Sequence, residues 1–197
     1  MASAPLYTGR RVTIRRVTPD DAGLLHGWLQ DPSFAAYQPT LMQICASPGD
    51  LAGRIALLQS LDPPVEIEAM VLHRPTGAPI GIMSLAGIDL VNRKAELSLA
   101  FRRGRGTRCV AEAVAFALES AFSTLNLRKV IFHVAADNAA VLRMARRYGA
   151  VEEGCLREEV ARGEAGWSDL YRFAFWRHEW EAGSLRPQLT RVAPVTA

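Results

Sequence analysis

The pattern of apolar and polar residues near the start of the chain predicts a strand followed by a helix. Apolar and polar side chains alternate over residues 12–17 (VTIRRV), which predicts a half-buried strand. The tetrapeptide TPDD that follows supplies a hydroxyl for a helix N-cap, a proline at the first helical position and an acidic residue three positions after the cap. These signals predict a helix from Pro19 to Leu29, which the Asp31-Pro32 step ends.

The middle of the chain predicts a second helix and three strands. Residues 32–47 show no clear period, and we interpret them as a loop or short helix over a cleft. Helical spacing returns in residues 48–61 (PGDLAGRIALLQSL). Alternation over residues 65–72 and 80–88, with the turn sequence PTGAP between them, predicts a β-hairpin, and residues 95–101 (AELSLAF) predict a third strand.

The second half of the chain returns to helix, strand and helix. Apolar residues recur every three or four positions from residue 110 to residue 125, which predicts the longest helix. Residues 129–135 (KVIFHVA) predict a strand, and the next segment predicts a helix capped by Asp137 or Asn138 and stopped by Gly149. Residues 151–180 predict two more strands around the polar turn ARGEAG.

This order of elements limits the fold class. An antiparallel meander followed by strand, helix and strand is not the pattern of a doubly wound nucleotide-binding fold. The order predicts an α/β (α+β) domain, in which a mixed sheet carries helices on both faces. We expect residues 1–9 to be a flexible N-terminus, residues 10–180 to form one domain, and residues 181–197 to be a frayed C-terminal tail.

Composition narrows the class of protein further. The chain has 197 residues and 49% hydrophobic content, enough for one substantial core, and no apolar run approaches the roughly 20 residues that span a bilayer. The N-terminus lacks the pattern of a secretory signal, and three widely spaced cysteines favour free thiols, so we expect a cytoplasmic protein. The arginine, alanine and glycine content suits a GC-rich bacterial genome. A net charge of +3 permits an anionic ligand without predicting nucleic acid, and no residue cluster has metal-ligand spacing.

Arginine and glycine concentrate between the strand at 95–101 and the long helix, in the sequence RRGRGTR (residues 102–108). A glycine-rich turn before a helix exposes backbone N–H groups at the positive end of the helix dipole, and arginines add charge-assisted hydrogen bonds. This arrangement suits a phosphate or pyrophosphate. The alternative interpretation is a solvated basic turn.

The chain resembles the GCN5-related N-acetyltransferase (GNAT) superfamily, specifically its RimJ/RimL-like branch, over about residues 10–180. The resemblance is carried, in order, by RVTIRRVTPDDAGLLHGWLQDP, PIGIMSLAGID, AELSLAFRRGRGTRCVAEAVAFALESAF, KVIFHVAADNAAVLRMARRYGA and WSDLYRFAFWRHEW. It implies a mostly antiparallel sheet of about six or seven strands with a splay between the fourth and fifth strands, which are residues 95–101 and 129–135.

The resemblance also implies acetyl-CoA or coenzyme A as the bound cofactor. In the family, the loop before the long helix holds the pyrophosphate and the pantetheine lies between the two splayed strands. The residues implied in cofactor binding are Leu99, Ala100, Phe101, Arg103, Gly104, Arg105, Gly106, Thr107, Arg108 and Asn138. The loop departs from the usual family pattern, because an alignment that starts at Arg103 puts Arg108 where glycine or alanine is expected.

A second departure concerns proton transfer. Relatives often protonate the leaving thiolate with a serine three residues, or a tyrosine seven residues, after the helix-capping asparagine; here those positions are Val141 and Ala145. Tyr148, nearly one helical turn further on, is a candidate acid, and its alternative role is packing near the helix end.

Two residues are candidates for the base that deprotonates an ammonium substrate. Glu96 lies on the strand before the arginine-rich loop, at a position that acts as a base in relatives, and its alternative role is an exposed or ion-paired glutamate. His133 lies on the adjacent strand, and its ordinary pKa near neutrality suits a base, although a histidine packed in the core is the more common case.

Together with the resemblance, these features predict an acyl-CoA-dependent N-acyltransferase, most simply one that uses acetyl-CoA, which acts on a primary amine by direct attack in a ternary complex. The acceptor is a small molecule or a peptide, with no nucleic acid or membrane partner, and a homodimer is left open. One alternative is a catalytically degenerate GNAT-fold protein with a binding or regulatory role. Another is an acyltransferase or decarboxylase that acts on a carrier-bound thioester in specialised metabolism.

Overall fold

A computed structural model describes residues 3–31, 34, 45–102 and 108–185. The strands are β1 (Pro5–Thr8), β2 (Val12–Arg16), β3 (Glu66–His73), β4 (Pro79–Asp89), β5 (Lys94–Phe101), β6 (Lys129–Ala135), β7 (Val151–Ala161) and β8 (Trp167–Trp176). The α-helices are α1 (Ala22–Leu29), α4 (Pro48–Ser60), α5 (Arg108–Glu119), α6 (Ala139–Arg147) and α7 (Arg177–Glu181). Short helical turns occupy Pro19–Asp21, Ser120–Thr124 and Gly163–Ala165.

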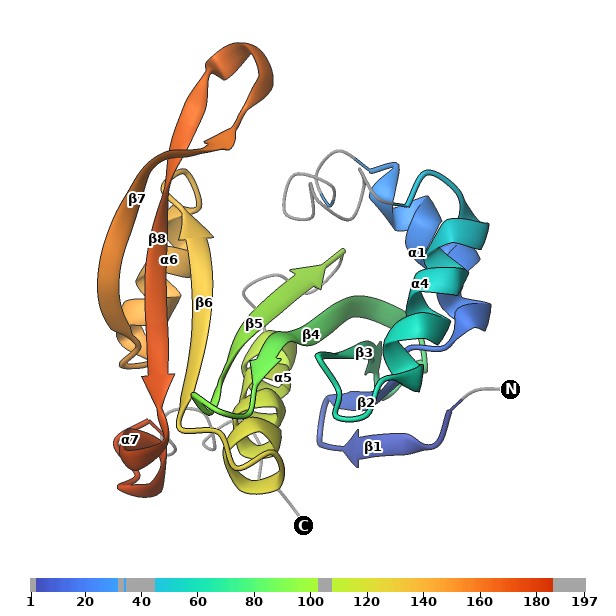
Figure 1. The fold of residues 1–197 in the computed structure, drawn as a ribbon, viewed down its shortest axis with the longest axis horizontal. Helices are drawn as coiled ribbons and strands as arrows, with labels where there is room; N and C mark the ends of the chain where they lie inside the picture. Colours follow the sequence, from blue (N-terminus) through green and yellow to red (C-terminus); the bar gives the residue numbers. More distant parts are fainter. Residues whose placement is uncertain (1–2, 32–33, 35–44, 103–107, 186–197) are drawn as a thin grey trace.

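The strands form one eight-stranded sheet in the order β1-β2-β3-β4-β5-β6-β8-β7 (Figure 1). All neighbouring strands are antiparallel except β5 and β6, which run parallel. The mixed, mostly antiparallel sheet with helices on both faces is therefore confirmed. The sheet has one more strand than the sequence predicts, because β1 adds an edge strand.

The N-terminal segment differs from its prediction. We expected residues 1–9 to be flexible, but Pro5–Thr8 pair with β2. Tyr7 anchors the strand, because its side chain is buried and its hydroxyl donates a hydrogen bond to Glu112 Oε1 on α5 at 3.3 Å. A four-residue strand is too short to show a clear alternation of apolar and polar residues, so the sequence pattern does not predict it.

The start of the predicted tail also differs. We expected residues 181–197 to be frayed, but α7 ends at Glu181 and Leu185 is buried against the main core. Residues 186–197 lie outside the described residues. A single leucine among polar residues carries no periodic signal, and only the fold provides the surface on which it packs.

Two cores lie on opposite faces of the sheet. The larger core packs α5 and α6 against one face, with Leu97 from β5, Val130 and Val134 from β6 and Phe173 from β8. The smaller core packs α1 and α4 against the other face of the N-terminal strands, and Ala100 of β5 joins it. Because neighbouring residues of a strand point to opposite faces, this division fixes the direction of each side chain on β5 and β6.

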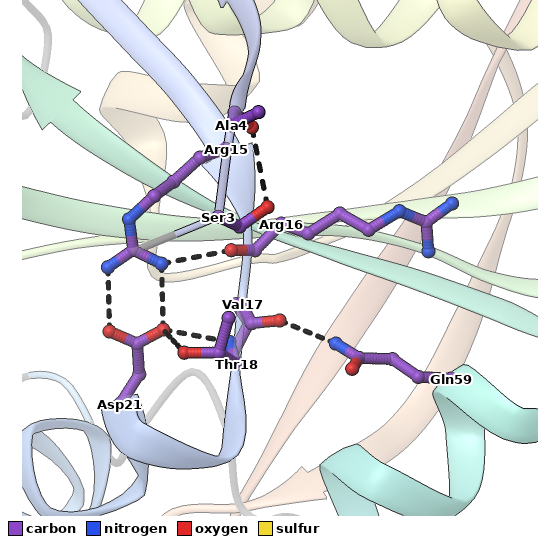
Figure 2. A network of polar contacts seen from close by, with 8 residues as sticks. All are labelled: Ser3, Ala4, Arg15, Arg16, Val17, Thr18, Asp21 and Gln59. Carbon is purple, nitrogen blue, oxygen red and sulfur yellow. Dashed lines mark hydrogen bonds and ion pairs between the residues drawn. The ribbon is translucent and has the colours of Figure 1, made fainter. Parts of the chain in front are cut away.

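An ion pair fixes the turn from β2 into α1 (Figure 2). The Arg15 guanidinium donates to both carboxylate oxygens of Asp21, at 2.8 and 2.7 Å, and the backbone N–H and hydroxyl of Thr18 donate to Asp21 Oδ2. The acidic residue three positions after the cap therefore binds back to the cap, as the sequence TPDD predicts. Asp21 therefore links β2 to the start of α1.

The parallel strands β5 and β6 separate partway along their length. They pair through Lys94↔Lys129, Ala95↔Val130 and Glu96↔Ile131 only, although β5 continues to Phe101 and β6 to Ala135. Beyond these pairs the two strands diverge in Figure 1. The predicted splay between these two strands is therefore present.

Candidate active site

A cavity of about 390 Å³ occupies the splay between β5 and β6. Its wall combines side chains from β5, β6, α5, α6 and the β7-β8 hairpin. The lining residues are Glu96, Leu97, Ser98, Leu99, Val114, Phe132, His133, Val134, Ala135, Asn138, Val141, Met144, Ala145, Tyr148, Val160, Arg162, Leu170 and Phe175.

The cavity passes through the sheet, because its lining residues point to both faces. Leu97 and Val134 belong to the core under α5 and α6, so this half of the cavity is apolar. Glu96, Ser98 and His133 alternate with those residues along their strands and therefore point to the other face. A long apolar group in one half would thus meet polar side chains in the other.

Glu96 and His133 form a pair at the point where the strands separate. Glu96 Oε1 lies 2.9 Å from His133 Nδ1, and the two side chains are 43% and 20% exposed. An ionised carboxylate only accepts hydrogen bonds, so Nδ1 carries the proton and donates it to Glu96. In the neutral imidazole, Nε2 is then the nitrogen that accepts a proton. The two predicted bases are therefore one hydrogen-bonded unit.

Helix α6 places the other predicted residues on the apolar side. Asn138 caps the helix by accepting a hydrogen bond from Val141 N at 3.3 Å, and it lines the cavity. Val141 and Ala145 also line the cavity, so the two positions that carry a hydroxyl in many relatives are apolar here. Tyr148 lines the cavity and also packs against the main core, so both roles considered for it stay open.

Two polar residues of the cavity were not predicted from the sequence. Ser98 lies two positions after Glu96 on the same strand, and this spacing of two was a usable signal for a shared face. Arg162 follows β7, and its Nε lies 2.9 Å from Asp137 Oδ2, just before the α6 cap. No local sequence pattern links Arg162 to Asp137, because their contact depends on how β7 and β8 return past β6.

The remaining residues predicted to bind the cofactor fall into three groups. Leu99 lines the cavity, whereas the side chains of Ala100 and Phe101 are buried in the two cores, so any contact from them would use backbone groups. Arg108 is exposed at the first residue of α5. The loop prediction for residues 103–107 falls outside the described residues.

Comparison with protein families identifies the chain. The family model described as "Acetyltransferase (GNAT) domain" matches residues 11–151. The chain belongs to the GNAT acetyltransferase family. The match extends along the chain from β2 to the end of α6 and includes Glu96, His133 and Asn138.

Curated relatives of this GNAT domain are N-acetyltransferases. One is the uncharacterized N-acetyltransferase p20 of Bacillus licheniformis, which is 27% identical over 180 residues, covering 89% of this chain and 97% of that protein. Another is the spermidine N(1)-acetyltransferase of Vibrio cholerae, which is 33% identical over 81 residues, covering 41% of this chain and 47% of that protein.

Solved structures share the GNAT fold. The spermidine N-acetyltransferase of Vibrio cholerae in complex with CoA and spermine superposes with a TM-score of 0.76 at 22% identity, covering 87% of this chain and 98% of that one. A dodecameric structure of the enzyme from the same organism gives a TM-score of 0.73 at 22% identity, covering 86% and 96%.

The cavity fits the cofactor of the family. The chain is an acetyl-CoA-dependent N-acetyltransferase of amines. The apolar half of the cavity suits the pantetheine arm, and β5 and β6 diverge beside it. This half is lined by Leu97, Leu99, Val114 and Met144.

Among the described residues, no group of His, Cys, Asp or Glu side chains could hold a metal ion, and no helix is long and apolar enough to cross a membrane.

Proposed function

We propose that the chain acetylates a primary amine and that the Glu96 and His133 pair accepts the proton of that amine. The observation that carries this proposal is the 2.9 Å contact between the two side chains in a cavity that crosses the sheet. The apolar half of that cavity suits the cofactor, and the polar half offers a proton acceptor on the opposite face. A base and a binding site for an acetyl donor thus share one cavity.

The amine must lose a proton before it can attack. A primary amine with a pKa near 10 is depleted in its neutral form about a thousandfold at pH 7. His133 would take this proton at Nε2, while the hydrogen bond from Nδ1 to Glu96 holds the ring in place and stabilises the imidazolium that forms. The pair therefore supplies the base that a mostly protonated amine needs at neutral pH.

Acetyl-CoA, when bound, supplies the acetyl group as a thioester. Leu97, Leu99, Val114 and Met144 would hold its pantetheine arm, and the backbone of β5 beyond Glu96 would pair with the amides of that arm, in the manner of an added strand. The loop at residues 102–108 would hold the pyrophosphate, in keeping with its arginine and glycine content. Tyr148 and Ser98 are the lining residues with a hydroxyl that could donate a proton to the leaving thiolate.

Two classes of acceptor deserve the first tests. A polyamine is one, because two of the similar proteins are named as spermidine N-acetyltransferases. A protein N-terminus is the other, because the sequence resembles the RimJ/RimL-like branch. Self-association as a homodimer also stays a prediction, and light scattering of the purified chain would test it.

The experiment is a turnover assay. Purified protein is mixed with acetyl-CoA and with spermidine, with a peptide that has a free N-terminus, or with a small monoamine, and release of the free thiol is followed. The proposal expects thiol release that depends on an amine and is lost in His133→Gln. Turnover that His133→Gln leaves unchanged would contradict the assignment of the base.

A further inference from the structure

A row of charged side chains crosses four strands on the face of the sheet that carries His133. Arg172 on β8 is the direct cross-strand partner of His133 on β6. Side chains of directly opposed residues point to the same face, with Cβ atoms about 5 Å apart. Because Phe173 and Phe175 of β8 belong to the core on the other face, Arg172 points to the face of Glu96 and His133.

Glu153 on β7 holds the Arg172 guanidinium in this row. Arg172 Nε donates to Glu153 Oε2 at 3.1 Å, and Lys129 Nζ of β6 donates to Glu153 Oε1 at 2.5 Å. Burial alone would raise the pKa of Glu153, but the hydrogen bonds and charges of Lys129 and Arg172 lower it. Glu153 is therefore ionised at neutral pH, and two cations share one carboxylate.

The charges around His133 oppose one another. Glu96 faces it from β5 and favours the imidazolium, whereas Arg172 faces it from β8 and disfavours it. Lys94 of β5 and Lys129 of β6 point to the same face nearer the start of the strands, and Glu153 of β7 partly neutralises the cations. Tyr148, which follows α6, and Arg162, which follows β7, line the same cavity.

We propose that Arg172 is a positioning residue that keeps the His133 imidazole neutral and able to accept a proton, and that Glu153 sets the strength of this effect. A base already protonated by its carboxylate partner could not deprotonate an amine. Arg172 lies on β8, on the side of β6 away from Glu96, and it does not line the cavity. This inference rests on the proposed role of His133 as the base.

The test is a pH titration of the His133 imidazole by NMR. The chain has four histidines, and His133→Gln identifies the His133 resonance. In Arg172→Gln the midpoint of His133 should rise by about half to one pH unit, because a repelling cation is lost. In Glu153→Gln it should fall by a similar amount, because Arg172 and Lys129 lose their carboxylate. Arg172→Lys keeps the charge and should leave the midpoint within about 0.2 pH units of the wild type.

The matched control lies on the opposite face of the same strands. Arg146 of α6 binds Glu152 at 2.9 Å and lies over the Tyr171 ring of β8, so Arg146→Gln removes a paired arginine that does not face His133. The titration midpoint of His133 should be the same in Arg146→Gln as in the wild type.

Two results would overturn the inference. One is a His133 midpoint that stays fixed in Arg172→Gln. The other is a shift in the same direction in Arg172→Gln and Glu153→Gln. The resonances report His133 whether or not an amine is acetylated, so a failed turnover assay and an absent shift are separate outcomes. If Arg172→Gln does not fold, the predicted fall in Glu153→Gln still decides the question.

Discussion

Glu96 Oε1 accepts a hydrogen bond from His133 Nδ1 at 2.9 Å, and Glu96 belongs to the last residue pair that joins β5 to β6, Glu96↔Ile131. The same divergence of the strands opens the cavity, and His133 lines it. The position of the proposed base and the proposed site of the acetyl donor therefore share one structural cause. Shifting the register of β5 against β6 would remove both.

The first prediction concerns the two members of this pair. His133→Gln should lower kcat/KM for the amine by about a hundredfold or more, the range typical of a lost general base. Glu96→Gln should cost about tenfold, because the imidazole stays but loses its charged partner. Steady-state kinetics measures both. His178→Gln, an exposed histidine of α7, is the control and should leave kcat/KM unchanged.

The second prediction concerns the leaving thiolate. Tyr148→Phe keeps the ring that packs against the main core and removes only the hydroxyl. We expect kcat to stay within about twofold of the wild type, as the packing role of Tyr148 predicts. Single-turnover kinetics with acetyl-CoA measures the effect. A loss of about a hundredfold would instead make Tyr148 the general acid.

The third prediction concerns the ion pair between Arg15 and Asp21. Burial alone would raise the pKa of Asp21, but the hydrogen bonds from Arg15 and Thr18 and the charge of Arg15 lower it below its ordinary value of 3.8. Asp21→Asn should lower the free energy of unfolding by about 2 kcal/mol at neutral pH, because the half-buried Arg15 loses its charged partner (Figure 2).

The ion pair also predicts how the difference in stability between wild type and Asp21→Asn changes with pH. A carboxylate whose pKa is lowered in the folded state stabilises the protein above the ordinary value and loses that contribution as the pH falls through the folded value. The difference between wild type and Asp21→Asn should therefore be complete above about pH 5 and shrink below pH 3.8. Urea unfolding across this range measures it, and a difference that does not vary with pH would exclude the ion pair as its source.

The fourth prediction concerns the buried phenol of β1. Burial, and then the charge of Glu112 and the hydrogen bond to it, raise the pKa of Tyr7 from 10.0 to about 12. A group with a raised folded-state pKa stabilises the protein fully below its ordinary value and loses that contribution as the pH rises through the folded value. The free energy of unfolding should therefore fall by about 2 kcal/mol more in wild type than in Tyr7→Phe between pH 10 and 12. Parallel slopes in the two proteins would show that Tyr7 ionises freely.

The sequence predicts the elements of this fold well where their periods are long. The order of strands and helices from β2 to β8 follows from alternation, spacing of three and four, and the caps at Thr18 and Asn138. The sequence does not predict β1 or the packing of Leu185, because a short strand and a single leucine show no periodic pattern. Both are fixed by contacts that form only after the sheet exists.

The site is less readable from the sequence. Glu96 and His133 are each recognisable from the sequence as a candidate base, but their contact depends on the register of two strands that α5 separates in the sequence. Ser98 could have been found from its spacing to Glu96. The positions of Arg162 and Arg172 could not be predicted, because each depends on how the β7-β8 hairpin lies beside β6.

Isothermal titration with acetyl-CoA tests the central claim, that the acetyl donor binds in the cavity between β5 and β6. Met144 of α6 lines this cavity, whereas Arg143, its neighbour on the same helix, is exposed and does not line it. Met144→Trp should fill the apolar half and weaken binding at least tenfold, while Arg143→Trp should bind as the wild type does. Binding to Met144→Trp with wild-type affinity would place the donor elsewhere and contradict the account.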